Sequence, residues 1–110
     1  MIYHIAAMSD WAQRSGRYAP SGWEAEGFIH CSNESQVPVV AGARFAGRTD
    51  LVVLHVEESL LDAPLVWEDS SEAGQDFPHI YGEIPVAAIA RVQAFPCDAA
   101  GSFSEWDPTV

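Results

Sequence analysis

The chain has 110 residues, which is enough for one domain and too short for two ordinary ones, and its 48% hydrophobic content excludes a mostly disordered protein. It carries 16 acidic residues against five arginines and no lysine, so its net charge is −11. Because such a chain repels polyanions, we expect no binding to duplex DNA, long RNA or anionic membrane surfaces, whereas a small anion held by one or two arginines remains compatible with the composition.

The sequence shows no pattern typical of export or membrane insertion. The first eight residues lack the basic region of a signal peptide. The most apolar run, Leu51 to Val56, is far too short to cross a bilayer. Cys31 and Cys97 form neither a disulfide framework nor a metal-binding pair. We therefore expect a cytoplasmic protein with a single domain over residues 1–110, and the oligomeric state stays open.

Helix-capping residues and glycines mark the elements of the N-terminal half. Ser9 is a candidate N-cap, and Gly16 follows as a helix end. Ser21 begins a capping-box pattern, which Gly27 closes. Pro38 is tolerated only in the first turn of a helix. In chain order we expect a strand over 2–5, a helix over 9–15, a short helical piece over 21–26, a strand over 28–31, and a helix that ends near residue 45 and begins either at a cap near Ser35 or after a tight turn.

Strands dominate the C-terminal half. Leu51 to Val56 is the clearest of them, and further strands are expected over 65–68, 80–81 and 90–95, the last two joined through Pro85 and a short helical turn. Because helices come early and strands late, we expect the α+β class, with a mixed or antiparallel sheet of about five or six strands and two or three short helices. The aromatic tail over 97–110 is expected either to pack on the body or to fray.

Three histidines from separate predicted strands form the main candidate site. Side chains alternate between the faces of a strand. His30 therefore shares a face with Ser32, and His79 shares one with Tyr81, while aliphatic neighbours point away. His4 lies on the first strand, opposite Tyr3 and Ile5. The economical interpretation is one polar cleft lined by His4, His30, Ser32, His79 and Tyr81.

A structural role is the alternative for each of these histidines, with the ring nitrogens bonded to backbone carbonyls. We assign that role outright to His55, which lies in an apolar strand near Glu57. Cys31 follows His30, but adjacent strand residues point to opposite faces, so the two cannot form a Cys–His pair. Cys31 is expected to be a small buried hydrophobic residue.

Motifs for metals and nucleophiles do not occur in the sequence. No histidine pair has i,i+4 spacing and no Cys-x-x-Cys occurs, so we expect no metal, and a histidine-based metal enzyme is the least favoured alternative. Neither a Gly-x-Ser-x-Gly elbow nor a glycine-rich phosphate loop is present. Glu68 and Glu83 lie near apolar strand ends and remain the candidate acids of the site.

Three motifs carry a resemblance to a known family. Ile-Tyr-His-Ile over 2–5, Glu-Gly-Phe-Ile-His-Cys-Ser over 26–32 with Gln36 following, and Phe-Pro-His-Ile-Tyr-Gly over 77–82 resemble a small bacterial family of unknown function, domain-of-unknown-function family number 952. The match runs down to Phe95. That family in turn resembles the ADP-ribosyltransferase fold, which has a histidine on its first strand, a glycine before its second, and a tyrosine before a later acid. The resemblance therefore implies an ADP-ribosyltransferase-like fold.

The same resemblance implies a cleft that binds or processes NAD, ADP-ribose or a related nucleotide-like ligand, with NAD as a candidate substrate and no certain cofactor. His4 would hold the ribose hydroxyl, Tyr81 or Phe28 would stack on a ring, and an acid would stabilise an oxocarbenium-like transition state. The expected catalytic residues are His4, His30, His79 and Glu83, and the expected ligand-binding residues are Ser32, Gln36, Tyr81, Phe28 and Glu68. A non-enzymatic binding or regulatory module on the same fold is the alternative, because Ile29 or His30 stands where the transferases carry tyrosine or serine.

Overall fold

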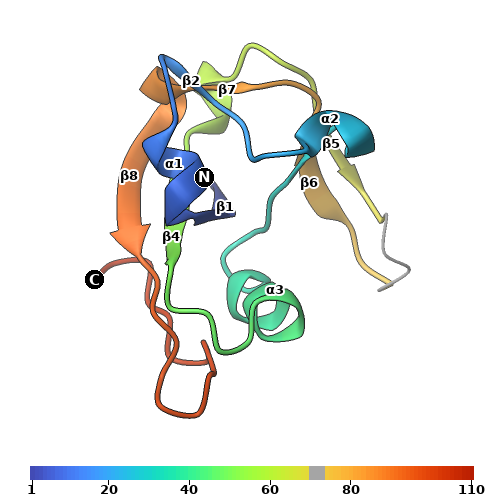
Figure 1. The fold of residues 1–110 in the computed structure, drawn as a ribbon. Helices are drawn as coiled ribbons and strands as arrows, with labels where there is room; N and C mark the ends of the chain where they lie inside the picture. The colour runs from blue at the N-terminus through green and yellow to red at the C-terminus, as the bar shows by residue number, and fades with distance from the viewer. Residues whose placement is uncertain (70–73) are drawn as a thin grey trace.

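Small antiparallel sheets and short helices build the fold in the computed structural model, which describes residues 1–69 and 74–110. Figure 1 shows β1, β4 and β8 on one side of the molecule, β5 and β6 on the other, and α3 below them. In chain order the described elements are β1 (Ile2–Ala7), α1 (Met8–Ala12), β2 (Arg17–Tyr18), α2 (Trp23–Glu26), β3 (Ile29–His30), α3 (Val37–Arg44), β4 (Leu51–Val56), the 3₁₀ turn η1 (Glu58–Leu60), β5 (Leu65–Glu68), β6 (Phe77–Ile80), β7 (Ile84–Pro85), the 3₁₀ turn η2 (Val86–Ala88) and β8 (Ile89–Ala94).

Strand β4 is the central strand of the first sheet, with β1 and β8 antiparallel on its two edges. All six of its residues are buried, as expected for a strand that is apolar except at His55. Val52, Leu54 and Val56 face one apolar core, and Leu51 and Val53 face a second. The alternation of a strand therefore lets β4 divide two cores.

The described strands form three separate sheets instead of the single larger sheet that we expected. Their orders are β1-β4-β8, β2-β7 and β3-β6-β5, and every described pairing is antiparallel. The first and third sheets meet at one bridge, where Tyr3 and Ser32 exchange two backbone hydrogen bonds of 2.8 Å. The expected strand over 28–31 is therefore only two residues long, because its chain crosses from one sheet to the other. The α+β class, the antiparallel strands and the three α-helices in the described ranges are confirmed.

Two predicted helix starts are wrong. Ser9 lies inside α1 because β1 continues to Ala7, and the Met8 N–H is bonded to the Asp50 carbonyl at 2.8 Å. The Ser21 side chain does not cap α2 but donates to Asp10 at 2.7 Å.

Other local expectations agree with the structure. Gly27 ends α2 with a φ of 86°, a conformation that glycine adopts without strain. Helix α3 begins after a tight turn, which was one of the two alternatives, and Pro38 lies in its first turn. Tyr81 lies just beyond β6, in a turn rather than in a strand. Strands β2 and β7 were not predicted, because two-residue strands leave no periodic pattern.

The C-terminal tail packs on the first sheet. Phe103 is buried with Phe95, their ring centroids 4.7 Å apart, and the Trp106 ring contacts Tyr3. Gln93 of β8 donates to the Asp107 carbonyl at 2.7 Å and accepts from Trp106 Nε1 at 3.1 Å. No helix in the described ranges combines the length and the apolar character needed to cross a membrane.

Candidate functional site

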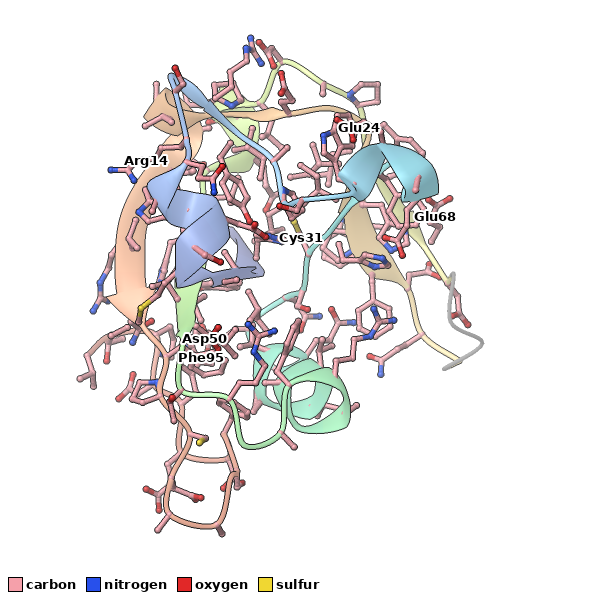
Figure 2. All side chains as sticks on the ribbon, in the orientation of Figure 1. Arg14, Glu24, Cys31, Asp50, Glu68 and Phe95 are labelled. Atoms are coloured by element: carbon pink, nitrogen blue, oxygen red, sulfur yellow. The ribbon has the colours of Figure 1, made fainter. Side chains whose placement is uncertain are left out.

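A cleft of about 600 Å³ lies between β1, α2, β3, α3 and β6. That volume is within the range of small-molecule sites. Figure 2 labels Cys31, which lines this cleft, on the segment that leads from α2 toward the centre of the molecule. Its lining includes His4, Asp10, Trp23, Glu26, Phe28, His30, Ser32, Val39, Arg44, Phe45, Arg48 and His79. The predicted convergence of His4, His30 and His79 is therefore present in the structure.

His4 is buried at the cleft floor, and both of its ring nitrogens are bonded within the protein. Nδ1 lies 2.6 Å from the carbonyl oxygen of His30, and Nε2 lies 2.9 Å from the hydroxyl of Tyr18. A carbonyl oxygen only accepts, so Nδ1 carries the proton and Nε2 accepts from Tyr18. Burial lowers the pKa of His4 to about 4, although the bond to the His30 carbonyl opposes that shift. His4 is thus a neutral group that joins β1, β2 and β3.

His79 is fully buried, and Glu68 and Phe28 are among the described residues that contact its ring. Its Nδ1 lies 2.9 Å from Glu68 Oε1, and the Tyr81 hydroxyl donates to the same carboxylate oxygen. The hydrogen bond from Tyr81 lowers the pKa of Glu68 the most, and the hydrogen bond with His79 lowers it further. Phe28 stacks on the His79 ring with centroids 4.1 Å apart. Tyr81 and Glu68, which we expected to contact a ligand, therefore orient His79 and do not line the cleft.

His30 is the histidine of this group that presents its side chain to solvent, with 34% of it exposed. Its Nε2 lies 2.5 Å from Glu26 Oε2, and its ring is edge-on to His79 at 5.3 Å. Burial lowers the pKa of His30, the Glu26 carboxylate opposes that effect, and the positive charge of Arg44 adds to it. The His30–Glu26 pair is thus the titratable pair at the open side of the cleft.

Ser32 and Gln36 have different positions. Ser32 is buried and lines the cleft, and its backbone forms the bridge to Tyr3. Gln36 lies outside the lining: its amide donates to the Asp76 carbonyl at 2.9 Å and to Gln75 at 3.0 Å. Gln36 therefore ties the start of α3 to the segment that enters β6.

Glu83 does not join the histidines, so its predicted place in the site is wrong. It lines a second hollow of about 450 Å³, together with Asp10, Arg14 and Arg17. The chain leaves β6 at Ile80, turns, and enters β7, which pairs with β2. That turn carries Glu83 away from the cleft. His55, assigned to a structural role, is buried with its Nε2 2.9 Å from Gln93 Oε1, so its partner is Gln93 rather than Glu57.

Sequence reasoning missed three lining residues of the cleft, Arg44, Trp23 and Phe45. Arg44 lies in the last turn of α3. A signal was available, because residues 35–49 contain no acid although the chain is strongly acidic. In the described ranges no group of three or more His, Cys, Asp or Glu side chains is arranged to hold a metal ion.

Comparison with known proteins places the chain in a family. Residues 5–92 match the family described as "Protein of unknown function (DUF952)". The crystal structure of protein CC0527 from Caulobacter crescentus is similar, with 37% identity and a TM-score of 0.78 over 92% of this chain and 90% of that one. The solution NMR structure of CC0527 has 35% identity and a TM-score of 0.77 over 93% and 90%. No curated protein matches the chain. The chain therefore belongs to the DUF952 family of proteins of unknown function.

Proposed function

We propose that the cleft binds a small nucleotide-like ligand, with NAD and ADP-ribose as the first candidates. The observation that carries this proposal is a cleft of about 600 Å³ whose lining includes three aromatic side chains and a partly exposed imidazole. Trp23, Phe28 and Phe45 supply flat apolar surface for a ring. His30 supplies a polar contact at the open side for a ribose hydroxyl.

The polar groups divide into a supporting set and a contacting set. His4 uses both nitrogens to join strands, and Glu68 and Tyr81 hold His79 from behind. The resemblance to ADP-ribosyltransferases implies a ribose contact from His4. Because those nitrogens are already bonded, we assign that contact to His30 instead. The ligand would therefore contact His30, Ser32 and one or more of the aromatic lining residues.

A transferase activity is the second candidate, favoured by the position of Glu26. Transfer through an oxocarbenium-like transition state needs a carboxylate near the sugar. Glu26 lines the cleft and contacts His30, whereas Glu83 lies in the other hollow. Glu26 thus replaces Glu83 as the acid of this hypothesis. If the protein consumes NAD, Glu26→Gln is expected to lower kcat by at least tenfold and to leave ligand affinity within about twofold.

Binding is tested by NMR titration of the protein with NAD, ADP-ribose and adenine nucleotides. We expect shifts at His30, Phe28 and Ser32. Val39 is an exposed residue of the cleft lining, so Val39→Trp is expected to block entry without disturbing the core. Val92→Trp, at an exposed position of β8 outside the lining, is the matched control. Binding that resists Val39→Trp, or no shift with any of these compounds, would contradict the proposal.

A further inference from the structure

Arg44 stands apart from the other arginines of this acidic chain. The others are held by the protein: Arg14 by the Trp11 carbonyl, Arg17 by Asp62, Arg48 by Asp50 and Arg91 by the Pro108 carbonyl. Within residues 1–69 and 74–110, Arg44 is the arginine for which no hydrogen bond or ion pair to the chain is found. In a protein of charge −11, this exposed guanidinium thus has no carboxylate partner among the described residues.

The charge of Arg44 lies at the cleft. Arg44 lines the cleft and lies close enough to His30 for its charge to affect that ring. The carboxylates among the described lining residues have other partners, because Asp10 accepts from Ser21 and Glu26 bonds to His30. The remaining arginine of the lining, Arg48, donates to both oxygens of Asp50. Among the described lining residues, Arg44 is therefore the positive charge for which no hydrogen bond or ion pair is found.

Stabilisation of α3 alone does not explain the position of Arg44. A cation in the last turn of a helix interacts favourably with the helix dipole, by about 0.3–1 kcal/mol. That effect accounts for an arginine near the end of α3. It does not account for its place in the cleft lining, or for the absence of acids from residues 35–49.

We infer that Arg44 is the specificity-determining residue of the cleft and that, with His30 beside it, it selects ligands that carry a phosphate group. Guanidinium groups bind phosphate oxygens in a bidentate geometry, which an ammonium group cannot reproduce. This inference rests on the proposed function and narrows it, because it separates nucleotides from the nucleosides that share their rings. It also predicts that a bound phosphate raises the pKa of His30, since a nearby anion favours the imidazolium.

The test compares adenosine with AMP, and adds inorganic pyrophosphate as a probe that has no ring. We expect the wild-type protein to bind AMP at least tenfold more tightly than adenosine. Arg44→Gln should lower the affinity for AMP to that for adenosine, and should leave the affinity for adenosine unchanged. The control is Arg14→Gln, which removes the same charge from a side chain that points away from the cleft (Figure 2) and should keep the preference. In the wild type, NMR should show that AMP raises the pKa of His30. In Arg44→Gln, AMP should leave the pKa of His30 unchanged.

The outcomes separate this inference from the proposed function. An unchanged AMP-to-adenosine ratio in Arg44→Gln, with both compounds bound, would overturn the role of Arg44 and leave the nucleotide-like cleft in place. If adenosine and AMP both fail to bind while pyrophosphate moves the His30 signal in the wild type and not in Arg44→Gln, the phosphate site stands and the nucleotide proposal falls. If neither AMP nor pyrophosphate depends on Arg44, the inference is wrong.

Discussion

The Nδ1 atom of His4 lies 2.6 Å from the carbonyl oxygen of His30, so the floor of the cleft is also the junction between two sheets. Close by, Tyr3 and Ser32 form the backbone bridge between β1 and the segment after β3. Because a carbonyl cannot donate, this contact requires a proton on His4 Nδ1, and the hydroxyl of Tyr18 occupies Nε2. We expected His4 to contact a ribose. In the structure both of its ring nitrogens bond within the protein and connect the strands around the cleft.

The first prediction concerns acid stability. The pKa of His4 is about 4 in the folded protein and near 6.5 in the unfolded chain. Between these values the unfolded chain binds the proton more readily, so the free energy of unfolding falls as the pH is lowered from 6.5 to 4. The contribution of His4 to that fall is about 3 kcal/mol. Urea unfolding at a series of pH values measures it.

Variants at His4 and Tyr18 isolate this contribution. His4→Phe removes the titrating group, so its pH slope should lack the part that belongs to His4. Tyr18→Phe keeps the imidazole and should cost about 1 kcal/mol. Since the lost hydroxyl favoured the neutral ring, the pKa of His4, followed by NMR, should also rise. Equal slopes in wild type and His4→Phe would show that His4 is not the group responsible.

The second prediction concerns the support of His79. The Tyr81 hydroxyl donates to Glu68 and is the largest cause of the lowered pKa of that carboxyl. Tyr81→Phe removes a donor that favours the charged form, so the pKa of Glu68 should rise toward its ordinary value. A ¹³C NMR titration of the side-chain carboxyl measures the change. Val66→Ala, an exposed position on the same strand, is the control and should leave the pKa unchanged. The same carboxyl pKa in wild type and Tyr81→Phe would refute the contact.

The sequence predicts the long strands best. Leu51 to Val56 is predicted residue for residue, because a strand buried on both faces is mostly apolar and the charged Asp50 and Glu57 flank this one. The single cleft that we expected also placed His30 and His79 together, and their rings lie 5.3 Å apart. Alternation within each strand could not show this contact, which comes from the antiparallel pairing of β3 with β6, where His30 lies opposite His79.

The predictions that are wrong concern segments outside the regular strands. Glu83 follows the end of β6 at Ile80, and a rule of period two has no meaning across the turn that leads into β7. The number of sheets depends on one backbone bridge, which no side-chain pattern encodes. The lack of acids over residues 35–49 hinted at Arg44, but what distinguishes it from the other arginines is their tertiary contacts, which a local pattern does not show.

The third prediction concerns the C-terminal tail. Phe103 is 3% exposed and packs on Phe95, so Phe103→Ala should lower the free energy of unfolding by about 3–4 kcal/mol. Release of the tail would also expose Trp106, whose fluorescence should shift to the red. Val92→Ala, at a position 40% exposed, should stay within about 0.5 kcal/mol of wild type. A Phe103→Ala protein as stable as Val92→Ala would mean that the tail contributes little to the core.

The last prediction concerns the turn after β6. A Cβ atom at Gly82 would lie 2.6 Å from the Cβ of Ala63, and the backbone of Gly82 is not in the left-handed region, so contact alone sets the cost. Gly82→Ala should therefore destabilise the protein by about 1–3 kcal/mol. Ala63→Gly removes the clashing atom, so adding it to Gly82→Ala should restore most of that loss, measured by thermal unfolding as a double-mutant cycle. Losses that simply add would show that the two positions do not touch.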